Sequence, residues 1–315
     1  MFKFVKLVQN ENMKLFRKTS TFIMMLLIVA FIAGAGAIFK MNVDDSAHRH
    51  WQADTEKEIA ALHQQLDHAQ GDQVNQIKEN IAIKQYRLDH DIAPTTETSV
   101  WGFSQYMTNM TLFIAIFTII AAGGMVSGEF GAGTIKLLLT RPVKRGTILL
   151  SKYVSTLFYS VILTVLSLVV SFIVGGLLFG FNGIGDPHLT YSQGAVHEHS
   201  MLGHIIAQYG FGYISIIIFA TIAFMISTVF RNTALAIGLS VFAMMGSGLI
   251  IMFLSRYAWG KYVLFSNLDL TVYFDGGEPP YKGMTLGFSL AVLVIYYIVF
   301  VAITWFSFKK RDVAA

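Results

Sequence analysis

The chain has 315 residues, of which 54% are hydrophobic and only 13% are charged. Soluble domains carry about 25% charged residues, so this composition excludes an ordinary soluble domain and predicts an integral membrane protein. The absence of cysteine excludes a disulfide framework, a thiolate metal site and a catalytic cysteine. The net charge is +4, and its distribution along the chain is more informative than its sum.

Residues 1–19 are predicted to form a basic amphipathic helix at the membrane surface. Phe4, Leu7 and Leu15 recur at helical spacing among five lysines and arginines, which is typical of a helix lying in the inner leaflet. The helix is either a charged anchor or an elbow that contacts a partner. Residues 20–41 are long and apolar enough to cross a bilayer and lack a small-residue cleavage site. We therefore predict a retained first span rather than a signal peptide.

Residues 42–100 form the only sizeable polar stretch. Apolar residues recur at helical spacing on both sides of Gly71, and Pro94 precedes the second span, so we predict an external hairpin of two helices. The stretch holds 11 acidic and five basic residues. This excess is typical of a solvated face, and we expect a packing or partner surface rather than a catalytic site.

Residues 101–315 are predicted to hold the other five spans. A crossing takes about 20 apolar residues. The six segments that qualify are 20–39, 103–126, 153–181, 205–230, 233–255 and 285–308. Only Arg231 and Asn232 separate the fourth from the fifth, and one continuous helix would be far too long for a single crossing, so we predict a tight turn. The fold class is therefore an all-α polytopic membrane protein with six transmembrane helices.

Charge asymmetry predicts the orientation. The side with both termini, the 127–152 loop and the 231–232 turn carries 14 basic and three acidic residues, whereas the other side carries nine basic and 16 acidic residues. The positive-inside rule places both termini in the cytoplasm. No Asp, Glu, Lys or Arg falls within the six segments, which argues against a proton- or sodium-driven carrier and against an aspartyl intramembrane protease.

Polar residues within and between the spans allow more than one interpretation. At the start of the second span, Gln105, Thr108 and Asn109 either line a substrate path or are hydrated at the interface. In the third span, a Ser/Thr stripe between Thr156 and Ser171 is more typical of helix packing than of substrate lining.

The loop before the fourth span contains four histidines. They are His188, His197, His199 and His204. Imidazoles at such spacing could ligate a metal, but the glycines around them favour a solvated loop, and we predict no metal. Aromatic residues in the external segment 256–284 fit an interfacial belt.

The loop at 127–147 is the most basic stretch between two spans. Glu129 is expected near the start of a short helix, where a negative charge complements the helix dipole, and Pro142 is expected to end that helix. Ile135 and Leu138 belong to a small apolar patch. A merely positive loop needs no such patch, so we expect a protein or the membrane to cover it.

Basic residues flank this predicted helix, and Lys144, Arg145 and Lys152 are expected to contact the inner lipid headgroups. No G-x-x-x-x-G-K-[ST] motif occurs, so the chain is not expected to bind nucleotide phosphates in the usual way. We predict that it is not an enzyme and has no cofactor, and that any ATP hydrolysis takes place in a separate chain.

Residues 129–134 (EFGAGT) and 138–145 (LLTRPVKR) closely resemble the loop between spans two and three of ABC-2-type permeases. These permeases are membrane subunits of ATP-binding-cassette exporters, including bacitracin- and lantibiotic-resistance and multidrug-type systems. The resemblance extends to the six-span layout, the basic N-terminal elbow and the external segment 256–284. It covers most of the chain, with 42–100 as the variable insert.

The resemblance implies a type V exporter-like fold in a bacterial cytoplasmic membrane. It implies a dimer of permeases, identical or different, with two ATPases, and a substrate path along the permease seam where spans two and five are prominent. The loop would contain a coupling helix that docks on the ATPase. The residues that would form or brace this contact are Glu129, Gly133, Thr134, Ile135, Leu138, Arg141, Pro142 and Arg145.

The uncharged spans favour an amphipathic or apolar cargo, such as an antimicrobial peptide, a drug or a lipid-like molecule, and no nucleic acid is expected. Two other classes of function stay open. One is a membrane sensor or scaffold whose acidic external hairpin binds a ligand. The other is a membrane enzyme that uses the histidines.

Overall fold

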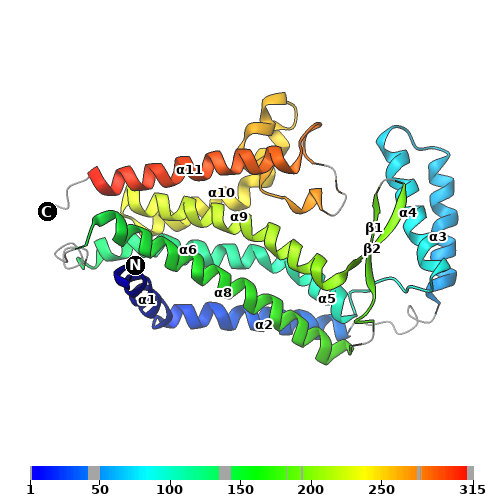
Figure 1. Ribbon diagram of the computed structural model, residues 1–315, viewed down its shortest axis with the longest axis horizontal. Helices are drawn as coiled ribbons and strands as arrows, with labels where there is room; N and C mark the ends of the chain where they lie inside the picture. The colour runs from blue at the N-terminus through cyan, green and yellow to red at the C-terminus, as the bar shows by residue number, and fades with distance from the viewer. Residues whose placement is uncertain are drawn as a thin grey trace. The chain divides into compact units, whose positions relative to one another are not determined.

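The computed structural model describes residues 2–41, 50–134, 143–181, 183–192, 194–274, 277 and 279–310 (Figure 1). Within these residues six helical runs are long and apolar enough to cross a membrane, which confirms the predicted all-α polytopic fold. They are α2 (Thr19–Met41), the run Val100–Gly131, α8 (Arg145–Phe179), α9 (Met201–Phe230), α10 (Thr233–Leu254) and α11 (Leu286–Lys310). The run Val100–Gly131 comprises α5 (Val100–Tyr106), the 3-10 turn η1 (Met107–Met110) and α6 (Thr111–Gly131).

The chain divides into two compact units. Unit 1 comprises Met1–Ala30, Asn109–Ser167 and Gln208–Ala315. It contains α1 (Phe2–Phe16), α6, α10, α11 and parts of α2, α8 and α9, together with the 3-10 turns η2 (Ala258–Tyr262), η3 (Leu264–Asn267) and η4 (Thr271–Tyr273). Unit 2 comprises Phe31–Thr108 and Leu168–Ala207.

The predicted tight turn between the fourth and fifth spans is confirmed. Helix α9 ends at Phe230, and α10 begins at Thr233. Arg231 adopts a positive φ of 54°, which reverses the chain. Asn232 caps α10, because its side-chain oxygen accepts a hydrogen bond from the Leu235 backbone N–H at 3.1 Å.

Hydroxyl groups join α8 to α9 within unit 1. Ser160 Oγ lies 2.9 Å from the Tyr213 hydroxyl, and Ser167 Oγ lies 3.2 Å from that of Tyr209. Ser160 and Ser167 are fully buried members of the Ser/Thr stripe. Because their hydroxyls face a neighbouring helix rather than an open path, these contacts support the packing interpretation of the stripe.

A second polar contact joins α6, α9 and α10. Ser127 donates its backbone N–H to Ser227 Oγ at 3.0 Å, and its own Oγ lies 2.6 Å from Thr233 Oγ1. Ser227 in turn donates to the carbonyl of Gly123 at 2.7 Å. The end of α6 that leads into the basic loop is therefore held by two neighbouring helices.

Unit 2 places two paired helices beside a short β-hairpin (Figure 1). The helices α3 (Trp51–Leu66) and α4 (Asp72–Asp89) pack together and are joined by an ion pair between Lys84 and Glu58. They occupy the stretch for which the sequence predicts an external helical hairpin. In the same unit, the Phe39 ring packs edge-on against Tyr106, with centroids 4.9 Å apart.

The β-hairpin is an element that the sequence analysis missed. Strands β1 (Pro187–Ser192) and β2 (Ala195–Ser200) pair antiparallel in the stretch predicted as a solvated loop. Gly194 has a φ of +85°, the left-handed region that a tight turn requires. The Tyr86 hydroxyl of α4 donates to Glu198 at 3.1 Å, and Leu189 is buried. The hairpin is thus stabilised by α4, a neighbour that its own sequence does not reveal.

Candidate functional site

The candidate site lies where two long helices flank the basic loop. Glu129 occupies the last turn of α6, and Lys152 lies two turns into α8. Gly133, with a φ of +68°, follows the end of α6 as glycine commonly does beyond a helix C-terminus. The Thr134 hydroxyl donates to the Glu129 carbonyl at 3.4 Å. The sequence therefore ends α6 close to Glu129.

Helix α1 contributes two further charges, Glu11 and Lys14. Leu7, Glu11 and Leu15 recur every four residues and share one face of α1. Ser155 of α8 donates to the Val8 carbonyl at 3.2 Å, which ties this helix to α8. Glu11 is consequently only 4% exposed, although it is charged.

The four charged side chains meet in what we call the ion cluster: Glu11, Lys14, Glu129 and Lys152. Lys152 Nζ lies 2.8 Å from Glu11 Oε2 and 2.6 Å from Glu129 Oε1. Lys14 Nζ lies 3.0 Å from Glu11 Oε1 and 3.2 Å from Glu129 Oε1. Each lysine thus bridges both glutamates, and the cluster has no net formal charge.

Burial differs sharply within the ion cluster. The side chain of Lys152 is 1% exposed, whereas that of Lys14 is 44% exposed. Burial by itself would raise the pKa of Glu11, but the nearby ammonium groups of Lys152 and Lys14 outweigh it and hold that pKa below its ordinary value. Burial would lower the pKa of Lys14, but Glu11 and Glu129 raise it overall. These charges therefore stabilise one another at neutral pH.

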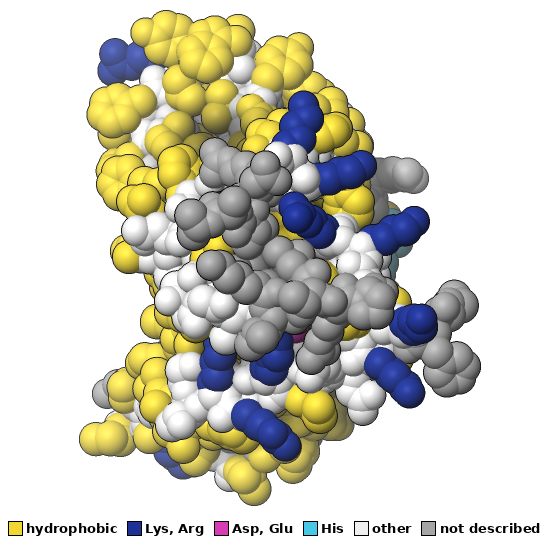
Figure 2. Space-filling view, turned by 90° about the vertical axis from the view of Figure 1, so that its left-hand side faces the viewer, with side chains coloured by type: hydrophobic (Ala, Val, Ile, Leu, Met, Phe, Trp, Pro, Cys, Tyr) yellow, Lys and Arg dark blue, Asp and Glu magenta, His cyan; other side chains and the backbone are white. Residues whose placement is uncertain are grey.

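A cleft of about 480 Å³ opens beside the ion cluster. The described residues that line it include Lys18, Gly128 and Thr134 in addition to Glu11, Lys14 and Glu129. Among the described residues, Glu129 Oε2 has no hydrogen-bond partner. Figure 2 shows the end of the molecule at which the N-terminus lies, and there the visible Lys and Arg side chains far outnumber the acidic ones.

Two predictions about this region are wrong. Glu129 does not lie at the start of a short helix but in the last turn of α6, where the helix dipole disfavours a negative charge. The two lysines compensate for that position. Lys152 does not contact lipid headgroups, because it is buried against Glu11 and Glu129.

The burial of Lys152 and Glu11 was not predicted, although the sequence contains a signal for each. Lys152, Thr156 and Ser160 recur every four residues, so Lys152 continues the buried hydroxyl stripe of α8. Glu11 likewise stands midway between Leu7 and Leu15 on the apolar face of α1. A charge on a buried face predicts an opposite charge facing it.

The remaining predicted coupling residues are only partly described. Gly133 and Thr134 are exposed just after α6, and Arg145 is exposed at the first position of α8. The other four, Ile135, Leu138, Arg141 and Pro142, lie outside the described residues. Contact of this loop with an ATPase stays a prediction.

The predicted substrate path at the start of the second span also stays a prediction. Gln105 belongs to α5, and Thr108 and Asn109 belong to η1. The Thr108 hydroxyl donates a hydrogen bond to the Gln105 carbonyl at 2.7 Å, so this hydroxyl has a partner within the same helical run.

Three of the four histidines lie on the β-hairpin of unit 2, and His204 lies in the first turn of α9. The rings of His188 and His204 stack with centroids 3.6 Å apart. Within the described part of the chain, no three His, Asp or Glu side chains are grouped to hold a metal ion. Burial, reinforced by His204, His199 and Arg87, lowers the pKa of His188 to about 4.

The stability of unit 2 is expected to fall as the pH drops from about 6.5 to about 4. The unfolded chain protonates His188 near its ordinary pKa of 6.5, whereas the folded chain resists protonation until about 4. The unfolded state then binds more protons, with a slope of at most about 1.4 kcal/mol per pH unit for one group. Thermal unfolding across this range should show a shallower pH dependence for His188→Gln than for the wild type. Identical profiles would contradict this prediction.

These observations define the class of the protein. Six apolar helical runs, within the residues that the structure describes, make the chain a multi-pass membrane protein. Over residues 73–314 it matches the family described as "Protein of unknown function (DUF2705)", and it belongs to that family.

Two relatives come from Bacillus subtilis (strain 168). The "Uncharacterized protein YhcI" is 36% identical over 313 residues, which cover 98% of this chain and 99% of that protein. The "Uncharacterized membrane protein YdbK" is 29% identical over 224 residues, which cover 70% of this chain and 87% of that protein. The multi-pass architecture thus has bacterial homologues.

Proposed function

We propose that the chain is the permease subunit of an ATP-binding-cassette exporter. The observation that carries this proposal is the ion cluster, which joins α1 to both helices that flank the basic loop. A force applied to that loop reaches α6 through its last turn and α8 through its first two turns. Because Glu11 and Lys14 bridge to Glu129 and Lys152, such a force would move α1, α6 and α8 together.

The resemblance of EFGAGT to the coupling loop of ABC-2-type permeases supports the same function. Glu129, the first residue of that stretch, is also a member of the ion cluster. Glu129 lines the cleft, and its Oε2 atom is buried without a hydrogen-bond partner among the described residues, so this carboxylate keeps an acceptor position for a donor that reaches it when the loop moves. The ATPase is that other protein in this proposal.

ATP binding would close two ATPases, move the two basic loops and switch a seam between two permeases from inward to outward access. The cargo biases this switch only through different affinities for the two states. An amphipathic or apolar cargo fits best, because the apolar parts of the spans carry no charge. The basic end in Figure 2 would then face the cytoplasm and its anionic lipids.

Co-purification tests this proposal directly. The tagged full-length chain, expressed in its natural host and solubilised gently, is expected to bring down a protein with a G-x-x-x-x-G-K-[ST] motif and vanadate-sensitive ATPase activity. Mass spectrometry identifies the partner, and an unrelated tagged six-span protein serves as the control. If no ATPase accompanies the chain, the exporter proposal is wrong and the sensor or scaffold interpretation takes its place.

Glu129→Gln is expected to lower the ATPase activity of the purified complex roughly tenfold. The change neutralises the carboxylate that pairs with Lys14 and Lys152 and that would accept a charge-assisted contact from the ATPase, a contact worth about 1.5–3 kcal/mol. Glu11 still pairs with both lysines, so the fold should persist. Glu58→Gln is the matched control, since Glu58 lies on α3 and its side chain is 60% exposed. Full ATPase activity in Glu129→Gln would exclude a coupling role for this carboxylate.

A further inference from the structure

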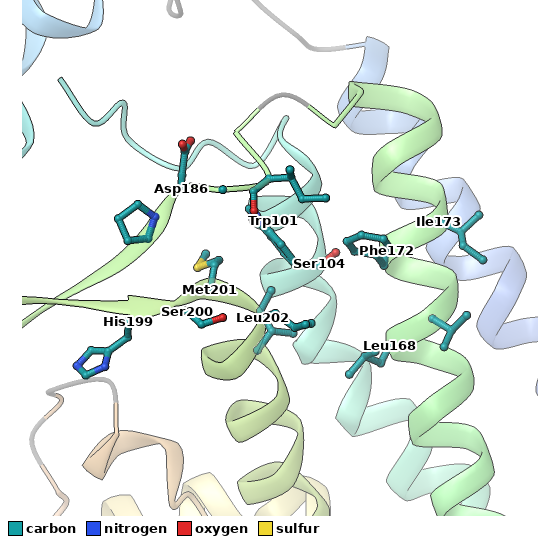
Figure 3. A pocket seen from close by; sticks show the side chains of 15 residues that line it. Trp101, Ser104, Leu168, Phe172, Ile173, Asp186, His199, Ser200, Met201 and Leu202 are labelled. Carbon is teal, nitrogen blue, oxygen red and sulfur yellow. The ribbon is translucent and has the colours of Figure 1, made fainter. Parts of the chain in front are cut away.

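Unit 2 contains a cavity of about 740 Å³ (Figure 3). It lies between α5, the second half of α8, the base of the β-hairpin and the first turns of α9. The parts of α5, α8 and α9 that line it belong to apolar helical runs long enough to cross a membrane. Charge asymmetry predicts that these ends of the runs lie at the outer side. The cavity is therefore expected at the depth of the outer head groups and the first part of the lipid chains.

The interior of the cavity is apolar on both sides. Leu168 and Phe172 of α8 lie across the space from Trp101 of α5 and Leu202 of α9 (Figure 3). The Trp101 indole N–H donates to the Ile184 carbonyl at 3.0 Å, and the centroid of the ring lies 5.5 Å from that of Phe172. Because these contacts hold the ring in place, the apolar walls are preformed.

The polar side chains of the lining require no polar ligand. The Ser104 hydroxyl donates to the Val100 carbonyl at 2.7 Å. Asp186 is exposed, its carboxylate points away from Phe172 (Figure 3), and it already interacts in charge with Arg87. Of the described lining residues, none has a buried side-chain nitrogen or oxygen that lacks a hydrogen-bond partner. A water molecule in a cavity needs about two to four polar partners, so the interior suits hydrocarbon better than water.

The cavity opens onto helix surfaces that a bilayer would cover. Val169, Ile173 and Leu202 line the cavity and are each about half exposed. The exposed apolar surface continues beyond the lining to Leu177 of α8 and Ile206 of α9. Lipid chains are as apolar as such side chains and solvate them within the bilayer. A chain of the surrounding leaflet therefore reaches the cavity from the side without passing through water.

We propose that this cavity binds one acyl chain of a phospholipid from the outer leaflet, with the chain between Trp101 and Phe172 and the head group outside. Its volume of about 740 Å³ lies within the range of about 300–1,000 Å³ that holds drug-sized ligands. Protein interiors are otherwise packed as densely as organic crystals, so an unfilled apolar space of this size would forfeit many dispersion contacts. The proposal concerns binding alone and holds whether or not an ATPase partner exists. A free fatty acid is the competing occupant, and the experiment separates the two.

Fluorescence quenching by brominated lipid tests the proposal, because bromine quenches tryptophan only at close range. The full-length chain is placed in nanodiscs of phosphatidylcholine with bromine atoms midway along one chain. The contribution of Trp101 is the difference in emission between the wild type and Trp101→Phe. We expect this contribution to fall at least about twofold and in proportion to the mole fraction of brominated lipid, as one site requires. A Trp101 contribution that brominated lipid leaves unquenched would overturn the proposal.

Variants that narrow the cavity separate a chain inside it from lipid around the protein. Leu168→Phe should reduce the quenched fraction of the Trp101 emission at least about twofold. Met201→Phe narrows the cavity from α9 and should act in the same way, which keeps the test decisive if one variant does not fold. Leu177→Phe is the matched control and should change nothing, since Leu177 is 78% exposed on α8 and does not line the cavity. Equal quenching in folded narrowing variants and in this control would overturn the proposal.

A brominated fatty acid in nanodiscs of unbrominated phosphatidylcholine tests the competing occupant. It should quench Trp101 no more than its mole fraction predicts, because the phospholipid already supplies the chain in the cavity. Quenching well above that fraction would show that the cavity selects a single-chain amphiphile, and the assignment to a phospholipid would be wrong.

Discussion

Replacing Lys152 with methionine should lower the free energy of unfolding by about 3–5 kcal/mol, the usual cost of removing one partner from a buried ion pair. Lys152 is 1% exposed and lies within 2.8 Å of both Glu11 and Glu129. Its loss would leave the buried carboxylate of Glu11 and the partly buried carboxylate of Glu129 with only Lys14, which is 44% exposed. The effect should appear as a large fall in the unfolding temperature of the detergent-solubilised chain.

Lys144→Met is the matched control, because Lys144 is exposed on the same basic loop. It should change stability by less than about 0.5 kcal/mol, as surface substitutions usually do. The double variant Glu11→Gln, Lys152→Met should recover much of the loss, since Glu129 then pairs with Lys14. If Lys152→Met is no more destabilising than Lys144→Met, the ion cluster does not stabilise the fold.

Gly102→Ala should cost about 3 kcal/mol, near the upper end for overpacking. A Cβ atom at Gly102 would lie 1.9 Å from the Thr96 carbonyl oxygen and 2.6 Å from its carbon. These are backbone atoms, so no side-chain rotation relieves the clash. Gly102 also donates its N–H to Ser99 Oγ at 3.0 Å, the cap that begins α5. The start of α5 would have to move, and Trp101 with it.

The unfolding temperature and the intrinsic tryptophan fluorescence of Gly102→Ala report this displacement. Gly34→Ala provides the comparison in the same unit, because a Cβ atom at that position in α2 meets no other atom within 4 Å. It should be neutral or slightly stabilising, since alanine has the higher helix propensity by about 1 kcal/mol. Equal behaviour of the two variants would contradict the close approach of Gly102 to Thr96.

The ion cluster lies in unit 1, and the cavity lined by Trp101 and Phe172 lies in unit 2. In the proposed transport the cluster would transmit movement of the basic loop to three helices. Because Lys152→Met is expected to destabilise the fold, Glu129→Gln is the variant that tests coupling.

The helical spans could be predicted from the sequence to within a few residues at most ends. Local apolar runs decide them, because a bilayer requires backbone hydrogen bonds to be satisfied within each segment. The ends of α6 and α8 were predicted less well, since both helices continue past the apolar runs to Gly131 and from Arg145. That extension places Glu129 and Lys152 on helices.

The candidate site was only partly predictable. Glu129 was singled out through the resemblance, but its partners were not, because Glu11 and Lys152 are 141 positions apart in the chain. The β-hairpin was not predicted for a similar reason. Its short strands depend on contacts with α4, and a solvent-facing strand shows little alternation of apolar and polar residues.

The sequence by itself determined the six spans, the tight turn at Arg231 and Asn232 and the basic character of one set of loops, because hydrophobic run length, turn chemistry and charge are local properties. Only the tertiary structure decided that Lys152 is buried between two glutamates and that Trp101 and Phe172, 71 positions apart, line one cavity. Both arrangements depend on which helix faces pack together, and residues distant in the chain settle that packing.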